Sequence, residues 1–345
     1  MVAYIVRRSL LGLFSCLVIS FLSFVVVQLP PGDYADYFAH AVSGRTAILS
    51  SGLETCCTQE QIEEFREDLG LNQPFLKQYW DWMSDMLLRA DFGDAQAIGL
   101  SSLSRPVKEI IIERLPVTVA LGIFTILITW TLSIPIGIYS AVRHHSIGDY
   151  VFTFVGFTGM AVPDFLLGLV LLYIFFAYFD MSVGGLFSGE YTDAPWSLGR
   201  VWDLIKHMLI PAIVLGTSGT AALVRIMRNN LLDELNKAYL VTATAKGLVY
   251  WKAVVKYPVR VALNPLVSGI GSILPSLIGG SIIVSWVLSL PTLGVVLLEA
   301  LRIEDVQLAG TMILLMGILT VVGLLVSDLL LVIVDPRIKL TGSGR

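Results

Sequence analysis

Six long apolar runs dominate the pattern of hydrophobic and polar positions along the chain. They cover residues 9–29, 115–142, 150–179, 207–224, 266–290 and 311–334. About 20 apolar residues in a helix are enough to cross the hydrocarbon core of a bilayer. The pattern therefore predicts an all-α integral membrane protein with six transmembrane helices. Pro163 and Asp164 interrupt the third run, and the fifth is rich in glycine and serine, which permits close approach between helices.

A short basic start that contains Arg7 and Arg8 precedes the first run, as it does in a secretory signal peptide. The apolar run is longer than a signal-peptide core, however, and no small-residue cleavage site follows it before Pro30. We therefore expect a retained first helix with the N-terminus in the cytosol.

Two polar segments between the apolar runs carry opposite charges. Residues 32–114 hold 14 acids and seven Lys or Arg, a net charge of −7, whereas residues 225–265 hold seven Lys or Arg and two acids, a net charge of +5. Lys and Arg near membrane-spanning helices accumulate on the cytoplasmic side. The charges predict that both termini are cytoplasmic, that 32–114 lies outside and that 225–265 lies inside.

Three regions follow from this topology. Residues 1–31 form an N-terminal tail and the first helix, residues 32–114 form a small extracytoplasmic domain, and residues 115–345 form a five-helix core. In the small domain, Gly70 is placed to end one helix and Pro74 to begin another. The second helix carries an apolar stripe at helical spacing: Phe75, Tyr79, Trp82, Met83 and Met86. Such a stripe is more typical of a domain core or a membrane-interface face than of a ligand site.

The basic loop is too long for a simple hairpin and predicts short helices that are broken at Gly247 and Pro258. It is either a solvated cytoplasmic loop that obeys the charge rule or a docking element for a cytosolic partner. Its motif Thr242-Ala243-x-Ala245-Lys246-Gly247-Leu248, followed by Ala262-Leu263-x-Pro265, resembles the "EAA" loop of ABC-importer permeases in the oligopeptide, dipeptide and nickel branch. Shorter matches to that family are Pro31-Gly32-Asp33, Asp91-Phe92-Gly93 and Asp335-Pro336-Arg337.

The resemblance implies that the helix before Gly247 is a coupling helix, which sits in a groove of an ATPase subunit. We expect this helix, at about residues 238–246, to offer contacts to the ATPase and to end at Gly247 with a positive φ. The contact residues are Tyr239, Leu240, Ala243 and Lys246. The resemblance also implies a bacterial inner-membrane location and three kinds of partner: a second homologous permease, one or two cytosolic ATPase subunits and an extracytoplasmic substrate-binding protein.

The chain carries no chemistry that would supply energy. It has no G-x-x-x-x-G-K-[ST] phosphate loop, no H-E-x-x-H or G-x-S-x-G pattern, and no cluster of Cys and His. We therefore expect a non-catalytic pore subunit, bounded by membrane lipid, with no metal site, no cofactor of its own and no nucleic-acid partner. ATP and Mg²⁺ would be bound by the partner subunits.

Two acids lie inside apolar runs, where ionisable groups often mark functional sites. Asp164 either lines the translocation path, where it would bind a peptide's ammonium group, or caps and packs the helix that restarts after Pro163. Asp328 lies near the cytosolic end of the sixth run, where we expect it to pair with a basic residue.

The function favoured by these features is the import of peptides, as one half of the pore of an ATP-driven importer. The same machinery importing oligosaccharides or nickel is an alternative. A secondary transporter that works without ATP is another, but it would need charged residues near the bilayer midplane and internal repeats. The sequence offers one candidate acid and no repeat.

Overall fold

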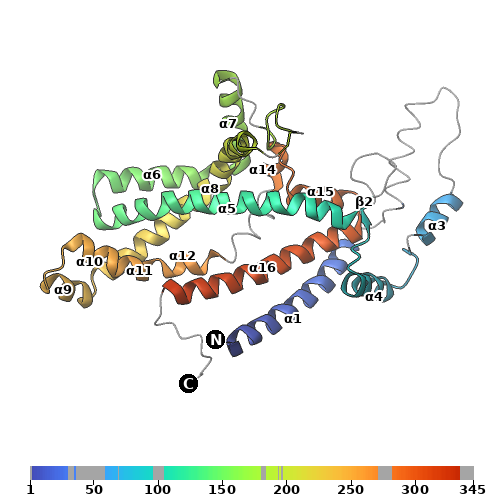
Figure 1. The fold of residues 1–345 in the computed structure, drawn as a ribbon, viewed down its shortest axis with the longest axis horizontal. Helices are drawn as coiled ribbons and strands as arrows, with labels where there is room; N and C mark the ends of the chain where they lie inside the picture. Colours follow the sequence, from blue (N-terminus) through green and yellow to red (C-terminus); the bar gives the residue numbers. More distant parts are fainter. Residues whose placement is uncertain are drawn as a thin grey trace. The chain divides into compact units, whose positions relative to one another are not determined.

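The computed structural model describes residues 2–29, 35, 59–68, 70–95, 105–179, 184–192, 194–195, 197–270 and 282–334. These residues are mostly α-helical (Figure 1). The small two-stranded antiparallel sheet, β1 (Asp94–Ala95) and β2 (Arg105–Pro106), pairs Asp94 with Pro106.

The chain divides into two compact units. The first comprises Met1–Leu11, Val117–Thr292 and Leu319–Arg345, and the second comprises Gly12–Pro116 and Leu293–Ile318. The helices α1 (Val2–Val27), α5 (Val107–Val142) and α16 (Val306–Val334) contribute residues to both.

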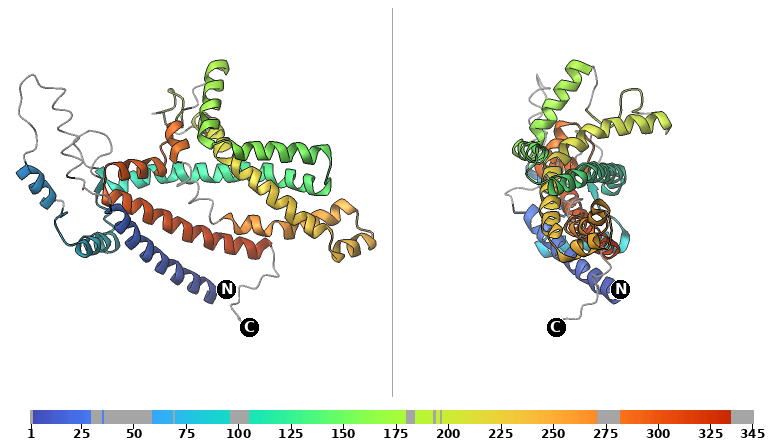
Figure 2. Two further views of the ribbon diagram at one scale, coloured as in Figure 1. Left: turned by 180° about the vertical axis from the view of Figure 1, so that it is seen from behind. Right: turned by 90° about the vertical axis from the view of Figure 1, so that its left-hand side faces the viewer.

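The first unit is built around one long helix, α8 (Leu198–Leu235), against which α6 (Ile147–Ala161) and α7 (Asp164–Phe179) pack. Helix α6 runs antiparallel to α5, and four short helices gather at the C-terminal end of α8 (Figures 1 and 2). These are α9 (Ala238–Ala245), α10 (Tyr250–Lys256), α11 (Pro258–Ala262) and α12 (Asn264–Ser268). The helix α14 (Ile282–Val287) contacts α7 and α8.

The third apolar run forms two helices rather than one continuous span. Helices α6 and α7 meet at an angle of 100°. Proline has no N–H for the helix ladder, and it forces the residue before it into an extended conformation. Val162 accordingly ends α6 with φ −86° and ψ 125°, and α7 begins just after Pro163. The interruption visible in the sequence is therefore a sharp break in the structure.

The predicted limits of the fourth span were too narrow, because helix α8 extends beyond both of them. It contains 38 residues where residues 207–224 were expected. At 1.5 Å per residue it is about 57 Å long, whereas the hydrocarbon core is about 30 Å thick. Arg225 and Arg228, which the charge pattern assigned to a loop, belong to this helix. The helix continues because Met227 and Leu231 extend its apolar face and are fully buried.

Four of the described helices, α1, α5, α8 and α16, are long and apolar enough to cross a membrane, and the α6–α7 pair is a fifth if it counts as one span. The fifth predicted run, residues 266–290, lies partly outside the described residues, because only its ends fall within α12 and α14. The count of six spans therefore stays a prediction.

The second unit contains α3 (Gln59–Asp68), α4 (Phe75–Ser84), the π-helix η1 (Asp85–Arg89) and α15 (Leu293–Arg302). The predicted helix end at Gly70 is confirmed: its φ is +68°, and the N–H of Leu71 donates to the carbonyl of Arg66 (3.0 Å). The predicted helix start is confirmed too, since Pro74 directly precedes α4.

The apolar stripe of α4 is part of a buried core, as one of the two expectations for it predicted. Its rings pack on Phe24 of α1, with ring centroids 5.3 Å away for Phe75 and 5.5 Å away for Tyr79. Leu314 of α16 belongs to the same buried cluster. The stripe therefore attaches α4 to two of the long apolar helices.

Candidate docking site

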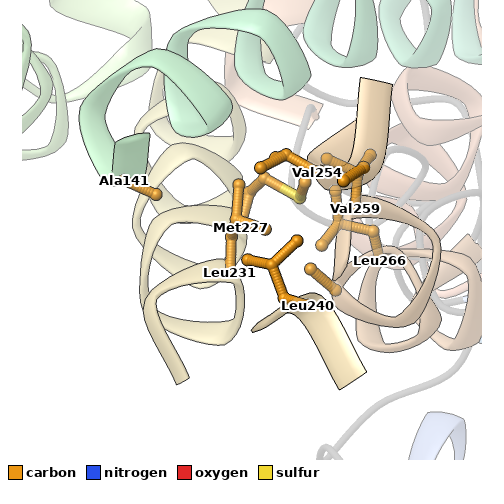
Figure 3. Packing of buried hydrophobic residues seen from close by; sticks show 9 residues of the cluster. Ala141, Met227, Leu231, Leu240, Val254, Val259 and Leu266 are labelled. Carbon is orange, nitrogen blue, oxygen red and sulfur yellow. The ribbon is translucent and has the colours of Figure 1, made fainter. Parts of the chain in front are cut away.

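Residues 236–268, which we call the docking element, fold onto the end of α8 around one hydrophobic core. Figure 3 shows Leu240 of α9 and Val254 of α10 converging on Met227 and Leu231 of α8. The buried members of this core are Ala141, Met227, Leu231, Leu240, Ala253, Val254, Val259, Ala262 and Leu266. Every helix of the docking element contributes to it, so the element is held as one body with the end of α8.

The predicted breaks in the basic loop are confirmed. Helix α9 ends at Ala245, and its C-cap Lys246 is followed by Gly247. Helix α10 ends at Lys256, and its C-cap Tyr257 is followed by Pro258 at the first position of α11. Proline is favoured there because the first helical N–H has no partner inside the helix.

Gly247 closes α9 with a left-handed residue, as predicted. Its φ is +88°. Its N–H donates to the carbonyl of Thr244 (2.9 Å), and the N–H of Leu248 donates to the carbonyl of Ala243 (3.2 Å). These are the two hydrogen bonds of a Schellman motif. The motif turns the chain sharply and brings Ala243 and Leu248 against the core of the docking element.

The residues predicted to contact an ATPase lie on two sides of α9. Tyr239 and Lys246 are exposed, and the Tyr239 hydroxyl donates a hydrogen bond to Glu234. Leu240, by contrast, is only 4% exposed, and Ala243 is half-buried against the core. The latter two side chains anchor the helix and are not part of its open face, so the expectation that Leu240 offers a contact needs this correction.

Several exposed apolar residues of the docking element were not predicted. Val241 is 66% exposed and Trp251 is 53% exposed, on either side of Gly247. The signal in the sequence is the presence of Val and Trp between lysines in a segment expected to be solvated. A basic segment with an exposed apolar face is suited to binding a protein partner.

Three contacts tie the docking element and its surroundings to the last helix. The hydroxyl of Ser327 donates to the carbonyls of Val267 (2.8 Å) and Ser268 (3.0 Å) at the end of α12. Asp328 forms an ion pair with Arg8 (3.1 Å), which confirms the predicted pairing with a basic residue. The ends of α1, α12 and α16 in this unit are thereby joined.

A second ion pair, which the sequence did not reveal, joins α6 to α8. The guanidinium of Arg228 donates two hydrogen bonds to Asp149, of 2.8 and 3.0 Å, and the backbone N–H of His145 donates a third to the same carboxylate (3.0 Å). Asp149 is 2% exposed. Bidentate pairs of this kind fix geometry as well as charge. The pair therefore links the start of α6 to the part of α8 that carries the docking element.

Asp164 lies at the first position of α7, directly after the break. Its carboxylate accepts a hydrogen bond from the hydroxyl of Ser218 on α8 (3.4 Å), and the described residues provide it with no backbone N–H partner. Of the two structural interpretations, packing against α8 fits this contact better than capping. The described residues contain no group of three His, Cys, Asp or Glu placed to hold a metal ion.

Comparison with known proteins identifies the family. The model of the binding-protein-dependent transport system inner membrane component matches residues 133–340, and that of the N-terminal part of such membrane components matches residues 1–122. The oligopeptide transport system permease protein AppB of Bacillus subtilis is 34% identical over 98% of this chain and 100% of its own length. The inner membrane ABC transporter permease protein YejB of Escherichia coli is 31% identical over 99% of both chains.

The dipeptide transport system permease protein DppB of Escherichia coli is 29% identical over 98% of this chain and 99% of its own length. Together with the apolar helices, these matches show that the protein is located in the inner membrane. The chain belongs to the family of binding-protein-dependent transport system inner membrane components and is an ABC-transporter permease subunit of the inner membrane.

Proposed function

We propose that this chain forms one half of the translocation pore of an ATP-driven importer of peptides. The names of the relatives, an oligopeptide and a dipeptide permease, support the cargo. The observation that carries the proposal is the docking element, in which a short helix is rigidly anchored on one side and open on the other. The energy must come from other subunits, since the chain has no phosphate-binding loop.

The partners follow from this role. Two cytosolic ATPase subunits, or one fused pair, bind ATP and Mg²⁺ and hold α9 through Tyr239, Lys246 and the turn at Gly247. A second, homologous permease completes the pore, an extracytoplasmic binding protein delivers the peptide, and lipid surrounds the helices. The topology has six spans and cytoplasmic termini, with residues 32–114 outside.

The structure offers a route for the movement. The docking element shares a core with the end of α8, and α8 continues without interruption over 38 residues. A displacement of α9 is therefore passed to α8 as a rigid body, and the Asp149–Arg228 pair passes it on to α6. Domain closure in the ATPases then switches the pore between a state open to the inside and a state open to the outside, because packed helices move as units.

Purification of the full-length tagged chain from its native membrane, with mass spectrometry of the proteins that accompany it, tests the assembly. We expect a related permease and an ATPase. The reconstituted complex should import a labelled tripeptide only when ATP is inside the proteoliposomes with the ATPases. Uptake that persists without ATP and follows an ion gradient would favour a secondary transporter instead.

A further inference from the structure

One face of the α6–α8 pair holds two opposite charges, and neither forms an ion pair with another of the described residues. Arg225 lies on α8, at the edge of a pocket of ≈230 Å³ lined by residues of α6 and α8. Asp164 lies beyond the end of α6, beside Ser218 of the same helix α8. Ser218 and Arg225 are seven residues apart, so they lie on one side of α8, about 10 Å apart along its axis.

Arg225 is held in place without a counter-charge. Its guanidinium stacks over the ring of Phe157 at 4.6 Å and reaches the sulfur of Met160 at 3.5 Å. None of the described carboxylates pairs with it. Its neighbour Arg228, which lines the same pocket, is neutralised by Asp149. A cation that is oriented by an aromatic ring but left unpaired is ready to receive an anion.

Asp164 is the complementary pole. Among the described residues its contact is the hydroxyl of Ser218, which leaves most of its acceptor positions unused. Between the two poles the surface is shaped by small and apolar groups. Gly156 lies against Ala221, where an added Cβ would be 3.6 Å from the Cβ of Ala221, and Phe157 and Met160 are exposed. Thr153 and Asn229 add polar groups to the pocket.

We propose that this face binds a short zwitterionic peptide during its passage, with the peptide's carboxylate on Arg225 and its ammonium group on Asp164. The inference rests on the proposed function and deepens it. An extended chain spans about 3.3–3.6 Å per residue. A short peptide can therefore reach both the Ser218–Asp164 contact and Arg225, because Ser218 and Arg225 differ by about 10 Å along the axis of α8. The small and apolar groups between the two charges admit varied side chains.

An acidic phospholipid would also satisfy Arg225, but it fits the face less well. A lipid phosphate needs only the cation, and it gains nothing from a carboxylate at the far end of the same helix face. The pairing of one acid with one base, each without an opposite charge of its own among the described residues, favours a ligand that carries both charges.

The test uses the complete reconstituted importer with three ligands: a tripeptide, its C-terminal amide and its N-acetyl derivative. Each is first shown to bind the delivering protein and is then supplied at saturation. Arg225→Gln should slow uptake of the free tripeptide about tenfold, as expected for the loss of one charged hydrogen bond, and should not slow the amide further. Asp164→Asn should do the same for the free ammonium group, with the N-acetyl derivative unaffected.

Matched controls separate this effect from damage to the protein. Arg143→Gln removes another exposed arginine that stacks on a ring, that of Tyr139 at 6.0 Å, and Asp81→Asn removes an exposed acid of α4. Both should leave uptake of all three ligands unchanged. Arg225→Lys should keep the dependence on the peptide carboxylate, and ATPase retention should be equal throughout.

Equal slowing of free and blocked peptides by Arg225→Gln or Asp164→Asn would overturn the inference while leaving the proposed function intact. A defect in Arg225→Gln that depends on acidic phospholipid in the vesicles, and not on the peptide carboxylate, would overturn it in favour of a lipid. If the wild-type complex imports no peptide, the proposed function fails and the inference fails with it.

Discussion

The acidic segment that contains α3 and α4 and the basic docking element are built from the same local parts. Each has a short helix that ends at a glycine with positive φ, +68° at Gly70 and +88° at Gly247. Each also has a proline where a later helix begins: Pro74 directly precedes α4, and Pro258 begins α11. Turn chemistry alone therefore does not distinguish these two segments.

The two segments differ in charge and in what they pack against. The docking element shares one core with the end of α8, to which each of its four helices contributes. Helix α4 instead lays a single aromatic stripe on α1 and α16. The sign of the charge predicts a side of the membrane for each segment, whereas the shared core is the feature on which the proposed transmission of a displacement rests.

The largest expected effect is all-or-none and tests the difference in charge. In a chain whose three native cysteines are replaced by serine, Glu64→Cys should react with a membrane-impermeant maleimide in intact cells, and Lys246→Cys only after permeabilisation. Both side chains are exposed. Labelling of position 246 from outside would invert the topology and remove the docking proposal.

The second prediction concerns the helix-ending glycine with positive φ that the two segments share. Gly247→Val and Gly70→Val force the same strain, because a residue with a Cβ in the left-handed region costs about 1–2 kcal/mol. No atom within 4 Å would block a Cβ at Gly247, so strain and not a clash is being tested. We expect Gly247→Val to lose ATPase co-purification and peptide uptake, while membrane insertion is kept.

Gly70→Val is the matched control for that experiment. It should keep the ATPase attached, since the helix it alters is not part of the docking element. Loss of the ATPase in both variants, or in neither, would show that the turn at Gly247 has no special role in coupling.

The turns and the long helices of the fold could be predicted from the sequence alone. Gly70, Pro74, Gly247 and Pro258 were predictable because φ and the missing N–H of proline are local constraints. The four long apolar helices were predictable because about 20 apolar residues need no tertiary context to indicate a span.

The remaining features depend on partners distant in the sequence. Leu240 faces inward because Met227 and Leu231 of α8 supply a core for it. Packing in the same core also explains why α8 continues past residue 224, where the apolar run ends. Arg228 pairs with Asp149 across 79 residues, and neither residue alone signals the other. The proline break was visible at Pro163, but its angle of 100° depends on how α7 packs on α8.

The third prediction compares a buried ion pair with an exposed one. Asp149→Asn leaves Arg228 without its counter-charge in a largely buried site, and breaking such a pair typically costs about 3–5 kcal/mol. The Arg89–Asp85 pair of the acidic segment has side chains that are 76% and 44% exposed. Asp85→Asn should therefore cost less than about 0.5 kcal/mol. Unfolding by SDS from mixed micelles measures both.

A double variant, Asp149→Asn with Arg228→Met, should recover part of the lost stability, because it removes the unpaired charge. Additive losses in the double variant would mean that the two residues act independently and that α6 is not linked to α8 through them.

The smallest effect compares two tyrosine hydroxyls. Tyr79 of α4 contacts the Ser20 hydroxyl of α1 at 2.9 Å, and because Ser20 donates its own hydrogen to the carbonyl of Leu17, Tyr79 is the donor. Ser20 is fully buried. Tyr79→Phe should cost about 1 kcal/mol, the net value of a typical hydrogen bond. Tyr239→Phe removes an exposed hydrogen bond to Glu234 and should change stability by no more than about 0.5 kcal/mol.

For these two variants, the loss of ATPase retention should be larger where the loss of stability is smaller. Tyr239 lies on the open side of α9, so Tyr239→Phe is expected to weaken ATPase retention slightly at high salt although the protein stays stable. Tyr79→Phe should loosen the attachment of α4 to α1 without changing ATPase retention. If Tyr79→Phe released the ATPase and Tyr239→Phe did not, force would pass through the aromatic stripe of α4, and the shared core at the end of α8 would not be what couples the docking element to the pore.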